Sequence, residues 1–138
     1  MYRVNRIIIV GGGSAGWLTA AFLSHNTDYE IIIVDKEDGK PIGVGEATLL
    51  NFKSFMANCG FKFEEWFEEI DATYKTGILF SGWGKNKRAV WHPFRSVPMA
   101  EPGEIRNEPT GFHIDCGKLV KFIQSKLLLL VIRSEVIE

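Results

Sequence analysis

The feature that most constrains the fold is a glycine-rich run near the N-terminus, Gly11 to Gly16, which reads Gly-Gly-Gly-Ser-Ala-Gly. A β-branched run, Arg6 to Val10, precedes it, and a segment rich in Ala and Leu, Ala15 to Ser24, follows. A second β-branched run, Glu30 to Asp35, comes next and ends in an acid. This order predicts a fully buried strand, a buried helix and a second strand, which form a βαβ unit with a parallel strand pair.

The glycine spacing fits GxGxxG, a pattern that binds a dinucleotide when it lies between a strand and a helix. Gly11 permits a tight turn, Gly13 lets a pyrophosphate approach the backbone, and Gly16 lets the helix pack on the strand. Ser14 and Ala15 open the helix, whose N-terminal N–H groups and dipole attract phosphate. The alternative is a glycine-rich turn in an α/β fold that binds no nucleotide.

The acid at the end of the second predicted strand supports the nucleotide interpretation. Asp35 lies nineteen residues after Gly16, where a carboxylate accepts hydrogen bonds from a ribose hydroxyl. An acid at this position disfavours the 2′-phosphate of NADP. FAD and NAD share the fingerprint, so the pattern alone predicts a dinucleotide without choosing between them.

Composition excludes several classes of protein. With 16 Lys+Arg against 17 Asp+Glu, the chain has no general attraction to nucleic acid or to a membrane surface. The longest strongly apolar run, Leu127 to Ile132, is far shorter than the roughly 20 residues that a membrane span needs. Cys59 and Cys116 belong to no CxxC, which disfavours a disulfide framework or a zinc site. We therefore expect no metal and a cytoplasmic location.

The remaining elements follow from apolar spacing and from punctuating residues. The pattern predicts a helix through Phe52 and Cys59 that stops at Gly60, and a second helical stripe from Phe63 to Ile70. Strands are predicted at 76–83 and 89–92. A helix over 116–130, capped by Asp115, and a strand that begins at Ser134 are predicted to follow. Three parallel strands with few helices leave a sheet incomplete, so we expect an N-terminal portion of a longer protein.

A second glycine pair marks another candidate ligand segment. Gly43 and Gly45, followed by Glu46 and Ala47, let the backbone pass close to a flat ligand. The simpler alternative is a loop that ends in a helix cap at Thr48.

Two further groups carry chemically useful side chains. Lys75 precedes an apolar strand, where it is either an ordinary surface lysine or a partly desolvated amine able to donate hydrogen bonds or react. His92 and Phe94 stand two residues apart, where they either flank a planar substrate or pack within a loop.

In combination these motifs resemble the flavin-dependent halogenases, especially the tryptophan halogenase family, over nearly the whole chain. The segment Gly11 to Gly16 resembles the family's FAD loop, and Pro41 to Thr48 resembles the segment along the flavin ring. The segment Asp71 to Lys75 resembles the stretch that holds the essential lysine. His92 and Phe94 match an element that sandwiches indole in tryptophan-specific members.

The resemblance implies a Rossmann-like α/β FAD-binding fold, with residues 1–138 as the FAD-binding module of a larger flavin monooxygenase-like protein. It implies reduced FAD from a separate flavin reductase, with halide and O2 as co-substrates. A flavin hydroperoxide and hypohalous acid would lead to halogenation of an aromatic small molecule such as tryptophan, with Lys75 as the catalytic residue. The full-length form would be compatible with a homodimer.

Two alternatives stay open. An FAD-dependent aromatic hydroxylase would share the dinucleotide unit but would have no use for Lys75. A truncated fragment would have no catalysis of its own, because the family's Trp-x-Trp-x-Ile-Pro motif and halide-binding loop are missing from this sequence. Leu50 also stands where many members have Pro. We therefore expect the isolated 138-residue chain not to halogenate.

Overall fold

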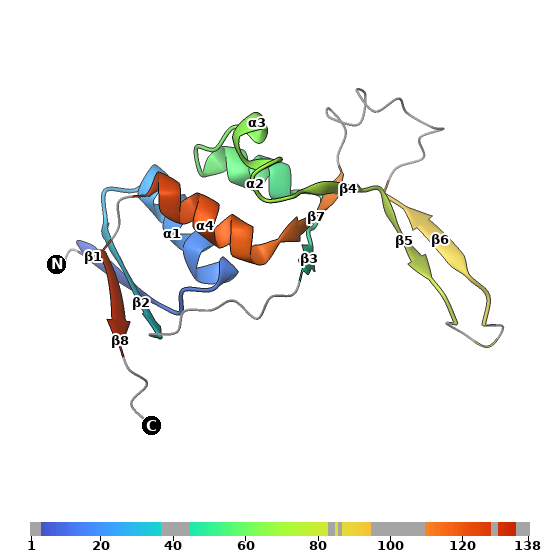
Figure 1. Ribbon diagram of the computed structural model, residues 1–138, viewed down its shortest axis with the longest axis horizontal. Helices are drawn as coiled ribbons and strands as arrows, with labels where there is room; N and C mark the ends of the chain where they lie inside the picture. Colours follow the sequence, from blue (N-terminus) through green and yellow to red (C-terminus); the bar gives the residue numbers. More distant parts are fainter. Residues whose placement is uncertain are drawn as a thin grey trace.

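The computed structural model describes residues 4–36, 45–82, 85, 87–94, 110–127 and 130–134 (Figure 1). In chain order the elements are β1 (Arg6–Val10), α1 (Ser14–Asn26), β2 (Glu30–Lys36), β3 (Gly45–Ala47), α2 (Phe52–Asn58), α3 (Phe63–Trp66), β4 (Thr73–Lys75), β5 (Gly77–Phe80), β6 (Val90–Pro93), β7 (Gly111–Asp115), α4 (Cys116–Lys126) and β8 (Leu130–Ser134). The described strands form sheets in the orders β1-β2-β8, β3-β7-β4 and β5-β6. The α/β class with a parallel βαβ start is confirmed.

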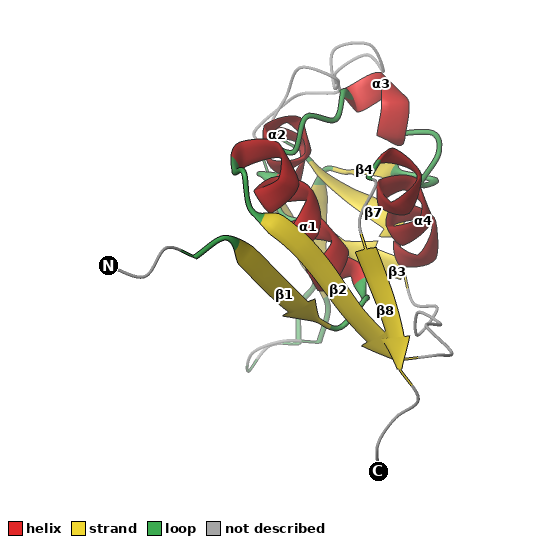
Figure 2. Ribbon diagram, turned by 90° about the vertical axis from the view of Figure 1, so that its left-hand side faces the viewer, coloured by secondary structure: helices red, strands yellow, loops and turns green. Residues whose placement is uncertain are grey.

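The first sheet is parallel throughout, with Ile8 opposite Ile32 and Ile32 opposite Leu130. Helices α1 and α4 lie against one of its faces (Figure 2). On that face Ile31 and Ile33 of β2 are buried among Trp17, Ala20 and Ala21 of α1. The βαβ unit therefore forms as the local pattern predicts.

The expectation that β1 is fully buried is wrong. β1 lies at the edge of its sheet, and its side chains alternate between part-buried and exposed. Ile8 is 58% exposed and Val10 is 83% exposed, whereas Ile7 and Ile9 pack against the core. The β-branched run specifies a strand, but within the described residues only one face of β1 is covered.

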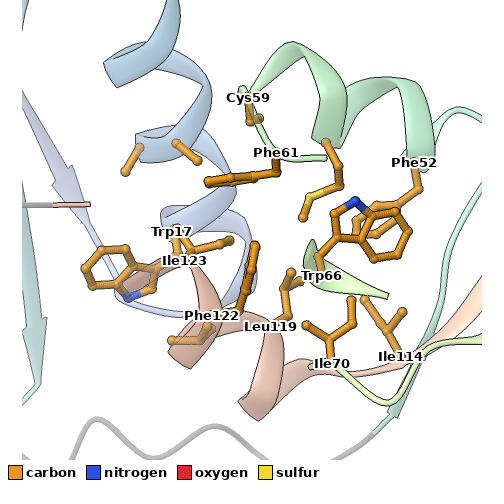
Figure 3. Packing of buried hydrophobic residues seen from close by; sticks show 14 of the residues in the cluster. Trp17, Phe52, Cys59, Phe61, Trp66, Ile70, Ile114, Leu119, Phe122 and Ile123 are labelled. Atoms are coloured by element: carbon orange, nitrogen blue, oxygen red, sulfur yellow. The ribbon is translucent and has the colours of Figure 1, made fainter. Parts of the chain in front are cut away.

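The core continues from α1 and α4 into α2, α3 and β7 (Figure 3). Trp66 is fully buried and meets the rings of Phe52 and Phe112 edge-on, with centroids 5.5 and 5.3 Å apart. The apolar stripe from Phe63 to Ile70 is regular helix only as far as Trp66, after which turns continue to Asp71. Ile70 is buried in the same core, its N–H donates to the Trp66 carbonyl, and the glutamates of this segment are exposed, as predicted.

Two predicted helix boundaries are confirmed and one cap is not. Gly60 follows α2 with φ +82°, a left-handed conformation that glycine adopts at helix ends. Asp115 caps α4 by accepting a hydrogen bond from the Lys118 N–H at 2.8 Å. Thr48 does not cap α2, which begins after Asn51. The Thr48 hydroxyl instead accepts a hydrogen bond from the Phe112 N–H at 2.9 Å.

The C-terminal boundaries also differ from the prediction. Helix α4 ends at Lys126 rather than near Leu130, and Leu130 begins β8. Ser134 is the last residue of that strand rather than its start. The physical reason is pairing with β2, because the β-branched pair Val131 and Ile132 completes the parallel sheet beside Ile33 and Val34.

The described part of the chain contains no helix with the length and apolar character needed to cross a membrane. Nor do the described residues bring three metal-ligating side chains together.

Both cysteines are unpaired and buried. Burial raises the pKa of the Cys59 thiol from 9.0 to about 11. The unfolded chain therefore loses this proton at a lower pH than the folded chain does, and the free energy of unfolding falls as the pH rises from 9.0 toward 11. Guanidinium unfolding at several pH values in this range measures the fall. Cys59→Ala is expected to show a shallower fall, and an identical slope in both proteins would contradict the assignment.

Candidate functional site

The glycine loop joins β1 to α1 and is shaped by its first residue. Gly11 has φ +111°, a left-handed conformation that L side chains rarely adopt. Its N–H donates to the Val34 carbonyl at 2.8 Å, which ties the loop to the end of β2. Gly13 is the N-cap of α1, with no side-chain cap and no acid in the first turn. The N–H groups at this helix end are therefore open to an anionic ligand.

Gly16 and Gly13 differ in the space that surrounds them. A Cβ on Gly16 would lie 1.9 Å from the Gly11 carbonyl oxygen, so the helix can approach the loop only because that atom is absent. A Cβ on Gly13 would meet no atom within 4 Å. The loop is thus closed on the side of Gly16 and open above Gly13, which fits a ligand that lies over the helix N-terminus.

Asp35 reaches this loop from the end of β2. A Cβ on Gly12 would lie 2.2 Å from the Asp35 carboxylate oxygen Oδ2, so the carboxylate lies directly against the loop backbone. Asp35 is part-exposed, which leaves it accessible to a ligand. The loop and the acid that the sequence predicts as partners are therefore adjacent.

A buried thiol links this loop to β3. Cys116, the first residue of α4, is buried, and its thiol lies near the side chains of Glu46 and Ser14. Burial raises the pKa of this thiol, the hydrogen bond and charge of Glu46 raise it further, and the contact with Ser14 lowers it. The arrangement brings the glycine loop and the Gly45–Ala47 segment together. Gly43 lies outside the described residues.

Lys75 and Phe94 form a second group. The Lys75 ammonium nitrogen Nζ lies 5.3 Å from the centroid of the Phe94 ring. Lys75 pairs with Gly111 of β7, and the hydroxyl of Thr110 donates to the Lys75 carbonyl at 2.8 Å. His92 lies on β6 in the hairpin that leads to Phe94, and its side chain is exposed.

Strand β7 lies between the two groups. Gly45 pairs with Asp115 at one end of β7, and Lys75 pairs with Gly111 at the other. These two positions are four residues apart, and a strand rises about 3.4 Å per residue, so the groups stand about 14 Å apart along the strand. The segment Gly111 to Asp115 resembles, by sequence, an element that begins the next helix of the family's FAD module. Sequence reasoning did not identify Cys116 or Thr110 as part of these groups, because their contacts depend on strand pairing between distant segments.

The sequence profile described as Tryptophan halogenase matches residues 6–106. The chain belongs to the tryptophan halogenase family. Within that family, tryptophan 6-halogenase SttH of Streptomyces toxytricini is 35% identical over 121 residues, which cover 81% of this chain and 23% of SttH. Tryptophan 7-halogenase RebH of Lentzea aerocolonigenes is 37% identical over 84 residues, which cover 59% of this chain and 16% of RebH.

Solved structures give the same fold. The flavin-dependent halogenase from Xanthomonas campestris superposes with a TM-score of 0.82 at 22% identity, over 99% of this chain and 36% of that one. The structure of SttH gives a TM-score of 0.77 at 22% identity, over 97% of this chain and 36% of SttH. The chain therefore has the fold of one part of these two halogenases and spans little more than a third of their solved chains.

Proposed function

We propose that this chain is the FAD-binding region of a flavin-dependent halogenase that acts on tryptophan or a similar aromatic molecule. The observation that carries the proposal is the open helix N-terminus at Gly13, with the Asp35 carboxylate against the same loop. Membership of the tryptophan halogenase family supports FAD as the dinucleotide. Residues 1–138 would then act as one FAD-binding module.

The proposed FAD contacts divide by position. The loop residues would hold the pyrophosphate, Asp35 the ribose, and the second glycine segment the flavin ring; the full set is Gly11, Gly13, Ser14, Ala15, Gly16, Asp35, Gly43, Gly45, Glu46 and Ala47. Bound reduced FAD supplies the activation of O2 that oxidises a halide. A separate flavin reductase would supply FAD in its reduced form, and the complete protein would be compatible with a homodimer.

Lys75 is the proposed catalytic residue. Its ammonium donates a hydrogen bond to hypohalous acid, or its amine carries the halogen, beside the aromatic substrate. His92 and Phe94 are proposed to bind that substrate. Along β7 the partner of Lys75 is Gly111, whereas the proposed flavin segment pairs with residues 113–115, about 7 to 14 Å farther along the strand, so the reactive halogen species would be used at a place distinct from the one where it forms.

Direct titration tests the cofactor proposal. We expect the purified chain, with its folded state checked by circular dichroism, to bind FAD measured by isothermal titration calorimetry. NADP is the comparison ligand. We expect it to bind far more weakly than FAD, because the Asp35 carboxylate repels a 2′-phosphate. A folded chain that binds NADP as well as FAD, or binds neither, would overturn the proposal.

Asp35→Ala is expected to weaken FAD binding without abolishing it. One lost hydrogen bond to a charged acceptor is worth roughly 1.5–3 kcal/mol, which corresponds to about a tenfold to a hundredfold rise in Kd. Asp28→Ala is the control, since Asp28 is an exposed acid that precedes β2 at its opposite end. Equal Kd values for the two variants would remove Asp35 from the site.

A further inference from the structure

We propose that Phe94 is a positioning residue for Lys75, whose ring holds the lysine side chain in one place through a cation–π contact. The inference rests on the proposed halogenase function, in which Lys75 acts on the halogen. It differs from the substrate-binding role proposed above for Phe94, because the contact is between the ring and a lysine of the same chain.

The backbone of Lys75 is fixed on two sides. Strand β4 pairs with β7, which places Lys75 opposite Gly111. The Thr110 hydroxyl donates to the Lys75 carbonyl at 2.8 Å, and Thr110 is only 4% exposed. The start of the lysine side chain therefore has a defined position, and only its methylene chain is free to move.

Gly111 provides the space in which the lysine and the ring meet. A Cβ on Gly111 would lie 3.6 Å from the Lys75 Cδ atom and 3.4 Å from the Phe94 Cε2 atom. The two side chains therefore converge on the same point above the glycine. A side chain at position 111 would also press on the Thr48 carbonyl oxygen, at 2.8 Å, so this opening is built into the packing of β7.

The backbone of Phe94 is tied to the same stretch of chain as the lysine. The Phe94 N–H donates to the Thr76 carbonyl at 2.9 Å, and Thr76 directly follows Lys75. The backbone of Phe94 is therefore bonded to the residue next to Lys75, which is consistent with the 5.3 Å between Nζ and the ring centroid. Among the described residues no carboxylate forms an ion pair with Lys75, so Phe94 is the group that attracts its charge.

Nuclear magnetic resonance of the 138-residue chain, labelled with ¹³C at the lysine Cε position, tests the inference. We expect the Cε methylene protons of Lys75 to be shifted upfield by the Phe94 ring current. Phe94→Leu should return this signal to the position of an exposed lysine, whereas Phe94→Tyr should preserve the shift because the ring remains. Lys53, whose Nζ lies 4.6 Å from the Phe63 ring centroid, is the internal control and should not change in either variant.

The outcomes separate this inference from the proposed function. An unchanged Lys75 signal in Phe94→Leu, with the Lys53 shift intact, overturns the positioning role. A simultaneous change of the Lys53 signal means that Phe94→Leu has altered the fold. In that case the result for Phe94→Tyr decides, because this variant keeps the ring. Loss of the Lys75 shift in Phe94→Tyr also overturns the inference. The measurement uses neither FAD nor halide, so failure of the FAD titration would leave its result standing.

Discussion

Gly13→Val is expected to abolish FAD binding while the chain still folds. Gly13 has φ −76°, which valine adopts without strain, and its Cβ would meet no protein atom within 4 Å. The added side chain would stand in the open space above the helix N-terminus, where the pyrophosphate is proposed to lie. Calorimetric titration with FAD measures the loss, and circular dichroism with thermal melting checks the fold.

Gly16→Val is the contrasting variant. Its Cβ would overlap the Gly11 carbonyl oxygen at 1.9 Å, so the loop itself must move and the melting temperature should fall sharply. Gly13→Val should cost only about 1 kcal/mol of stability, the typical effect of a poor N-cap residue. If Gly13→Val bound FAD as tightly as the unaltered chain, the pyrophosphate would not lie over this loop.

Lys75→Met is expected to eliminate halogenation while flavin oxidation continues. The test protein is a chimera in which this chain replaces the matching region of tryptophan 6-halogenase SttH. Methionine has similar length but has no amine to donate a hydrogen bond or to carry halogen. Halogenated tryptophan, measured by mass spectrometry, should vanish, whereas the rate of flavin reoxidation should match that of the unaltered chimera.

Lys53→Met is the matched control, because Lys53 is also a part-buried lysine over a phenylalanine ring. It should keep both activities. Retained halogenation in Lys75→Met would remove this lysine from the mechanism, and loss of both activities would assign it a role in folding or in FAD binding. Hydroxylated product from the unaltered chimera would favour the aromatic hydroxylase alternative.

The sequence predicted best those features that are formed by residues close together in the chain. The strand, glycine loop, helix and second strand form within residues 6–36. Gly11 has the tight turn and Gly16 the close packing that the glycine spacing predicts. The same local logic gave the Gly60 stop and the Asp115 cap. Motif resemblance added Lys75 and Phe94, which the strand pairing then brings together.

Contacts that depend on distant segments were not predictable in this way. The end of α4 was misplaced because the apolar run after it pairs with β2, a tertiary preference that overrides helical spacing. Burial of β1 was overestimated because one strand does not reveal whether both faces of its sheet are covered. The contact of Cys116 with Glu46 and Ser14 arises only when β3, α1 and α4 have assembled.

Strand β7 has a consequence for how a chain of this kind can change over generations. It is paired on both sides, and it places Phe112 and Ile114 in the core while His113 and Asp115 face outward. A single inserted residue would turn the buried pair toward solvent, because side chains alternate along a strand. Only an insertion of two residues would preserve the alternation. A single inserted residue therefore cannot lengthen the distance between the two groups without disrupting the core. The length of β7 should therefore stay constant among such chains.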